Sequence, residues 1–163
     1  DIKPLIESFD FARFGRAPAR FDEGELDTLN KKILHHTAYE AVKDRLPADM
    51  DEAAWNAIAP NLTKLDDVSD WWAVVKGPID AVAFEDEDRV FLTEAATAAE
   101  ALNWSSDPWH GLTGALKEAT GRKGKTLFLP LRLALTGKEH GPDMAALLPL
   151  IGKAEAVKRL GFK

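Results

Sequence analysis

The chain has 163 residues, of which 45% are hydrophobic, and it contains no cysteine. This composition predicts a folded protein with a sizeable core, and the absence of thiols excludes disulfides and thiolate metal sites. No run of about 18 uncharged apolar residues occurs, so we expect no membrane span. We expect a cytoplasmic protein. Because the chain opens on Asp1 rather than on Met or a signal sequence, we also expect a fragment or processed product.

Charge is distributed unevenly along the chain. The net charge of -6 at pH 7 argues against a general binder of polyanions. Residues 120–163 nevertheless carry nine Lys and Arg against three Asp and Glu, whereas residues 1–119 carry 12 against 24. This asymmetry indicates either that the C-terminal part meets an anion or that its basic face is solvated and pairs with the acidic part.

The first half of the chain shows helical signals. Asp22 and Glu25 match a capping box, and Phe21 and Leu26 occupy the positions of a hydrophobic staple. Apolar residues follow at helical spacing, namely Leu26, Leu29, Ile33 and Leu34. Further helices are predicted over residues 38–46, 51–59 and 66–76, the last stopped by a Gly-Pro step.

The second half begins with a predicted surface loop over residues 79–88, which holds the acidic run EDED. A helix follows, and Asp107 then caps another that has Pro108 at its first position and ends at Gly121. Three shorter helices are predicted over residues 124–136, 142–151 and 153–161. These signals predict an all-α fold of two small helical subdomains, residues 1–84 and residues 85–163.

Catalytic patterns are scarce. The sequence has no glycine-rich phosphate loop and no GxSxG motif, and adjacent His35 and His36 would diverge by about 100° on a helix, too far to share a metal. Ser105, Asp107 and His110 lie close together, but helix capping explains the first two. We therefore predict no catalytic residue and no metal site. The five tryptophans are interpreted as core residues rather than stacking platforms for bases.

The segment 121–144 is the most informative part of the chain, and it reads GRKGKTLFLPLRLALTGKEHGPDM. It combines a basic start, an apolar run interrupted by Arg132, and a Gly-Pro step that predicts a helix start with free backbone N–H groups. A guanidinium among leucines needs a partner. That partner is either an acidic residue of the first subdomain or an RNA base or phosphate.

This segment also carries a resemblance to a known family. The run GKTLFLPLRLALTGKEHGPDM, followed by LLPLIGKAEAVKRL, resembles the C-terminal end of bacterial glutamyl-tRNA synthetases of class I. The stretch RAPARFDEGELDTLN is similar to the segment that follows their catalytic region, and WWAVVKGPI fits the middle more loosely. The resemblance implies an all-helical anticodon-binding region of two subdomains. Its implied partner is tRNA(Glu), and tRNA(Gln) is a further candidate partner.

Site residues are implied by the same resemblance. Arg132 matches the arginine that contacts anticodon bases in that family, and Asn61 stands where some members use an arginine to read the first anticodon base. Some members carry Thr and Leu at the positions of Gly141 and Met144, so contacts there would be through backbone or van der Waals surfaces. Anticodon-lining residues are expected to be Arg132, Thr136, Gly141, Pro142, Met144 and Asn61. Phosphate contacts are expected from Lys123, Lys125 and Lys138.

The resemblance also implies that catalysis belongs to a domain outside this sequence. The two catalytic signatures of the family, His-Ile-Gly-His and a Lys-Met-Ser-Lys-type loop, are absent from this sequence. They belong to an N-terminal domain that would bind ATP and magnesium and attach glutamate, so this chain needs no cofactor of its own. We expect a monomer that binds neither DNA nor membranes. The alternative is a helical protein-interaction domain without an RNA role, in which the acidic run meets a partner.

Overall fold

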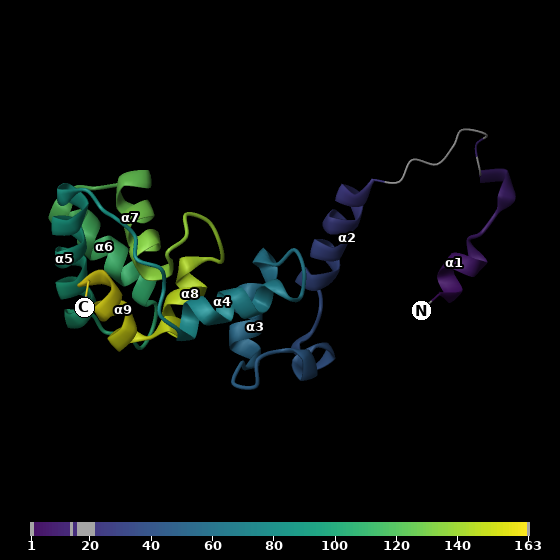
Figure 1. Cartoon of the computed structure of the whole chain (residues 1–163), viewed down its shortest axis with the longest axis horizontal. Coiled ribbons are helices and arrows are strands. Elements are labelled where there is room, and N and C mark those ends of the chain that lie inside the picture. The colour runs from purple at the N-terminus through teal and green to yellow at the C-terminus, as the bar shows by residue number, and fades with distance from the viewer. Residues whose placement is uncertain (1, 14, 16–21, 163) are drawn as a thin grey trace.

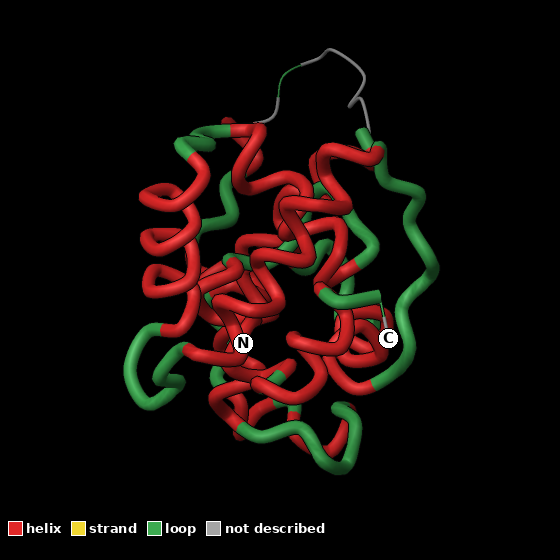
Figure 2. Tube along the Cα trace, turned by 90° about the vertical axis from the view of Figure 1, so that its left-hand side faces the viewer, coloured by secondary structure: helices red, strands yellow, loops and turns green. Residues whose placement is uncertain are grey.

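The computed structural model describes residues 2–13, 15 and 22–162. All the secondary structure within these ranges is helical, which confirms the predicted fold class (Figures 1 and 2). The α-helices are α1 (Lys3–Glu7), α2 (Glu23–His35), α3 (Glu52–Ile58), α4 (Asp67–Lys76), α5 (Asp86–Ala101), α6 (Pro108–Thr120), α7 (Lys125–Thr136), α8 (Met144–Ile151) and α9 (Lys153–Leu160). Single 3-10 turns are η1 (Phe11–Arg13), η2 (Tyr39–Ala41), η3 (Lys43–Arg45) and η4 (Ala59–Asn61).

Helix ends follow the capping signals of the sequence. Asp22 accepts a hydrogen bond from the N–H of Gly24 at 2.8 Å, and Asp107 accepts one from His110 at 3.1 Å. Each carboxylate thereby satisfies a backbone donor that the helix itself leaves unpaired. Gly121 ends α6 with a φ of 70°, a left-handed conformation that suits glycine. The predicted staple partner Phe21 lies outside the described residues.

The segment 38–46 is not the α-helix that the sequence predicts. It forms the two separate turns η2 and η3, because long-range hydrogen bonds fix its course. The Tyr39 hydroxyl donates to the carbonyl of Met50 at 2.9 Å, and Trp55 Nε1 donates to the carbonyl of Thr37 at 2.9 Å. The first contact ties the start of the segment to Met50 and the second lies beside it, and the backbone between makes two short turns that meet at Val42.

The acidic run 85–88 is not the loop that the sequence predicts. Glu85 is the N-cap residue of α5, and the next three residues form the first turn of that helix. Negative charge is favourable there because it faces the positive end of the helix dipole. The connecting loop therefore ends at residue 85 instead of residue 88.

The start of α4 also differs from the prediction. Asp66, predicted to open α4, makes no side-chain cap. Asp67 instead accepts hydrogen bonds from the N–H groups of Thr63 and Lys64.

A continuous core joins the two halves of the chain. Buried side chains of α3 and α4, such as Trp55 and Val68, belong to the same cluster as those of α5–α9. Helix α8 contacts both α3 and α4, and it lies between these helices and the C-terminal group in Figure 1. The division at residues 84 and 85 stays a prediction.

Within the described ranges, no helix is both long and apolar enough to cross a membrane.

A buried arginine of α9 connects these elements. Arg159 has a side chain that is only 3% exposed. Its Nη1 donates to the carbonyls of Val74 at 2.9 Å and Leu135 at 2.7 Å, and its Nη2 donates to the carbonyl of Gly77 at 2.8 Å. Its Nε donates a hydrogen bond to the Glu155 carboxylate at 2.9 Å. The guanidinium thus ties the C-terminal ends of α4 and α7 to α9.

Candidate nucleic-acid interface

Arg132 lies in α7 two residues after Pro130, and its side chain is half-buried. Nη2 donates to the carbonyl of Pro142 at 2.8 Å. Nη1 is buried, and no acceptor for it exists among the described residues. Burial lowers the pKa of Arg132, and the nearby Asp143 carboxylate opposes that shift. The partner of Arg132 is therefore a carbonyl of the same C-terminal part and not an acid of the first subdomain.

An unpaired donor of this kind is costly. A buried N–H without an acceptor destabilises a protein by about 1–3 kcal/mol, and by more when the group is charged. An acceptor that arrived from outside the chain would remove this cost. Because Nη1 is buried, an external acceptor would reach it only after the groups that cover it move aside.

Thr136 closes α7 and orders the loop that follows it. Its side chain is buried, and its hydroxyl lies 2.7 Å from the carbonyl of Arg132. The same oxygen accepts from the N–H of Lys138 at 3.1 Å. Because the hydroxyl is engaged by the backbone of its own chain, Thr136 shapes the loop and has little surface to offer a ligand.

Gly141 meets an aromatic ring of α4. Its φ is 153°, and a Cβ atom placed on it would lie 2.0 Å from Cη2 of Trp71. Lys138 holds its Nζ 5.6 Å from the centre of the same ring. Trp71 packs against the core as the sequence predicted, but it also supports a loop of the C-terminal half. Sequence reasoning gave it no place in the site.

Pro142 and Met144 are both buried. Between them, Asp143 accepts a hydrogen bond from the N–H of Ala145 at 3.0 Å and caps α8. The helix therefore starts at Met144 and not at Pro142, and an acid already occupies one of its free N–H groups. The Asp143 carboxylate thus already satisfies one of the N–H groups that the sequence was expected to leave open for an anion.

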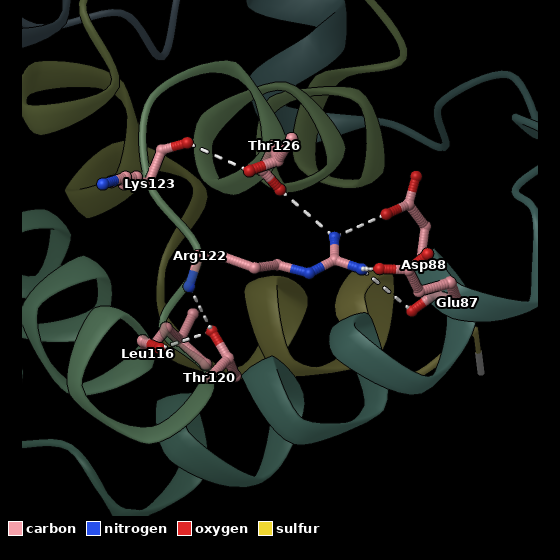
Figure 3. Close-up of polar contacts among 7 residues, drawn as sticks. All are labelled: Glu87, Asp88, Leu116, Thr120, Arg122, Lys123 and Thr126. Carbon is pink, nitrogen blue, oxygen red and sulfur yellow. Dashed lines mark hydrogen bonds and ion pairs between the residues drawn. The ribbon is translucent and has the colours of Figure 1, made fainter.

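The basic start of the segment 121–144 divides into an inward and an outward part (Figure 3). Arg122 points inward, where it pairs with Asp88 and with Glu87 Oε1 at 3.1 Å, and it donates to the carbonyl of Thr126 at 3.1 Å. Its guanidinium also lies 4.4 Å from the centre of the Phe91 ring.

The outward part consists of the lysines. Lys123, Lys125 and Lys138, the three expected phosphate contacts, are exposed. In Figure 3 the amine of Lys123 points away from the carboxylates that hold Arg122. Of the basic start, Lys123 and Lys125 are therefore the side chains directed to a phosphate, while Arg122 joins α5 to α7; Lys138 is exposed but lies over the Trp71 ring.

A hollow of about 370 Å³ lies next to the loop after α7. The residues that line it come from α4, from the 77–85 loop and from the end of α7, and they include Asp70, Asp80, Thr136, Gly137 and Lys138. The two carboxylates make this hollow unsuitable for a phosphate alone but suitable for a group with N–H donors, such as the amino group of a base.

Asn61 lies elsewhere on the molecule. It is exposed at the end of η4, which packs against α2 and α3. It is not among the residues that Arg132 and Trp71 bring together.

In the described part of the chain, no group of three or more His, Asp or Glu is placed to hold a metal ion. The bond between His110 Nδ1 and Asp107 at 2.7 Å lies at the exposed start of α6, where Asp107 also serves as the cap.

Comparison with known proteins adds an independent observation. The model of a family described as "Anticodon binding domain" matches residues 28–162. The chain is 62% identical to "Glutamate--tRNA ligase 2" of Sphingopyxis alaskensis and to "Glutamate--tRNA ligase 1" of Rhizorhabdus wittichii, each over 160 residues. These matches cover 98% of the chain but 36% of each relative, so the chain spans about a third of their length.

Solved structures give the same fold. A crystal structure of a glutamate tRNA ligase from Elizabethkingia meningosepticum, in complex with its amino acid, superposes with a TM-score of 0.76 and 24% identity. The match covers 99% of this chain and 36% of that one. The glutamate-tRNA synthetase of Elizabethkingia anophelis gives a TM-score of 0.75 at 21% identity. At these identities the likeness concerns the arrangement of the helices.

Proposed function

Since the chain belongs to the anticodon binding domain family, we propose that it binds the anticodon loop of a tRNA, and that this tRNA is the one charged with glutamate. The observation that carries the proposal is the buried Nη1 of Arg132, which has no acceptor among the described residues. A base edge in a single-stranded loop can supply that acceptor once the groups that cover Nη1 move aside, because unstacked bases expose their hydrogen-bonding edges.

The surroundings of Arg132 support the same assignment. Trp71 packs against Gly141 in the loop after α7, and the same loop carries the exposed Lys138. The adjoining hollow offers carboxylates, which can accept from the amino groups of bases. Exposed lysines at positions 123 and 125 can hold the backbone of the loop without reading its sequence. Base reading and backbone holding thus fall to different side chains.

We further propose that this recognition serves a larger enzyme. Relatives of which the chain spans about a third are glutamate–tRNA ligases, so the parent would attach glutamate to tRNA. ATP and magnesium would bind in its N-terminal part, and this chain would contribute binding energy and choice of tRNA. A monomer is proposed. Acceptance of the glutamine tRNA is also proposed, because Asn61 lacks the guanidinium that could read the first anticodon base strictly.

The alternative role as a protein-interaction domain loses its main support. That role assigned the acidic run 85–88 to a partner protein. Glu87 and Asp88 instead pair with Arg122 of the same chain.

The test is a titration of the chain with the anticodon stem-loop of the glutamate tRNA at two salt concentrations. A stem-loop with altered anticodon bases serves as the comparison. We expect preference for the native loop that survives the higher salt, since base contacts depend less on salt than phosphate contacts do. Arg132→Met should weaken binding by about 1–3 kcal/mol, whereas Arg45→Met, at an exposed position in η3, should change it little. Equal binding by a folded Arg132→Met protein would refute the base-reading role.

A further inference from the structure

Helix α2 presents an exposed apolar stripe made of Leu26, Leu29 and Ile33. The exposed fractions of these residues are 50%, 54% and 56%. Their spacing of three and four residues places them within about 60° of arc on one face of the helix. Sequence periodicity predicts this face, but burial is reached only at Leu34, which is 6% exposed.

The helix is nevertheless anchored, by the edge next to the stripe. Leu34 is packed in the core, and the Asn30 amide donates to the carbonyl of Thr63. Helix α2 therefore packs against η4, and the stripe of apolar side chains beside this contact stays exposed. Fully burying a Leu or Ile side chain contributes about 1.5–3 kcal/mol relative to leaving it exposed. Three such side chains in one row are typical of an interaction surface.

The position of the stripe in the chain indicates which part of the parent protein lies near it. Most of the exposed large apolar side chains in the described residues lie between Ile2 and Ile33. In the relatives, the matched region covers 36% of the length and forms the C-terminal part, so a longer N-terminal part precedes the region equivalent to this chain. The anticodon domain family matches from residue 28, inside α2, so the first turn of this helix lies at a junction.

We propose that the Leu26, Leu29 and Ile33 stripe is the docking surface for the N-terminal part of the parent protein, which offers it an apolar face. Glu25 and Lys32 border the stripe on the helix and would form the polar rim usual for such an interface. Docking at this surface fixes the orientation of the anticodon site relative to the rest of the enzyme. The inference rests on membership of the family and not on tRNA binding.

Thiol labelling tests the proposal, because the chain contains no cysteine of its own. Leu29→Cys is introduced both into this chain alone and into the full-length parent, without tRNA, and modification by a small thiol reagent is followed on the peptide by mass spectrometry. In this chain alone the thiol should react freely. In the parent, its rate should fall by about tenfold or more, since reaction would require local opening of the interface.

Val90→Cys is the matched control, because Val90 is 62% exposed on α5, outside the stripe. Its rate should be the same in both proteins, and Ile33→Cys should repeat the protection seen at position 29. Leu29→Cys that reacts equally fast in the parent and in this chain would overturn the proposal. Protection that appears in this chain alone and grows with its concentration would also overturn it, because a second copy would then cover the stripe.

Discussion

The ring of Trp71 occupies the space that a side chain at position 141 would need. A Cβ atom on Gly141 would approach Cη2 of that ring to 2.0 Å. Because Trp71 belongs to α4 and Gly141 to the loop before α8, this contact sets the loop on the first half of the chain. The position of the loop that accepts the Arg132 hydrogen bond thus depends on an aromatic residue from a different helix.

Gly141→Ala should therefore destabilise the protein. Overpacking against the Trp71 ring costs about 1–3 kcal/mol, and a φ of 153° adds strain for alanine. Urea unfolding measures the loss. Gly114→Ala is the control, since a Cβ there meets nothing within 4 Å on α6, and it should stabilise by about 0.5–1 kcal/mol. The loss at position 141 should shrink in a Trp71→Ala background; a loss of unchanged size would exclude the ring as its cause.

Arg159→Met should be among the most damaging substitutions of a charged residue. It leaves the carbonyls of Val74, Leu135 and Gly77 without their donor and the Glu155 carboxylate without its main partner. Breaking a buried ionic arrangement costs about 3–5 kcal/mol. The free energy of unfolding in urea gives the measurement.

Lys158→Met provides the comparison for Arg159. Its amine is exposed and lies 3.4 Å from the same Glu155, so its removal should cost less than about 1 kcal/mol. Similar losses for the two variants would mean that the carbonyl contacts of Arg159 contribute little.

Acid should weaken the Glu155 contact. The hydrogen bond from Arg159 holds the pKa of Glu155 below its ordinary value of 4.5, and burial opposes that shift. A carboxylate with a lowered pKa in the folded state stabilises fully above its unfolded pKa, and that contribution is lost as pH falls through the folded pKa. Glu155→Gln should thus be less stable than the parent at pH 6, and the difference should shrink below about pH 4. A difference that stayed constant from pH 6 to pH 3 would contradict this.

Lys125→Ala should lower the salt dependence of anticodon stem-loop binding. Removing one lysine–phosphate interaction reduces the slope of log K against log salt by about 0.7 to 0.9. Lys153→Ala is the control, because the Lys153 amine already donates to the carbonyl of Leu102 at 3.3 Å. A slope that is equal for Lys125→Ala and the parent would exclude Lys125 from phosphate binding.

Local signals in the sequence predicted most of the helices. Capping aspartates, terminal glycines and apolar spacing act within one or two turns, and α5, α6, α7 and α9 lie close to where these signals place them. The segment 38–46 was predicted wrongly because its helical pattern carries no sign of the contact from Tyr39 to the carbonyl of Met50, which lies beyond the segment.

Parts of the site that depend on long-range contact could not be read from the sequence. Arg132 stands out in a run of leucines, so its need for a partner could be predicted, but the identity of that partner, the carbonyl of Pro142, could not. Arg159 carries one local signal, the Glu155 four residues before it, which predicts only a surface pair. Its bond to Val74 spans 85 residues, and no pattern announces that distance.

The place of Arg159 near the C-terminal end of the described chain has a consequence for how the protein is made. Synthesis on the ribosome produces Arg159 85 residues after Val74 and 24 residues after Leu135. The carbonyls of Val74, Gly77 and Leu135 therefore lack the Arg159 donor until α9 has been made. Although domains tend to fold from the N-terminus during translation, the joint between the two halves of this one is completed late.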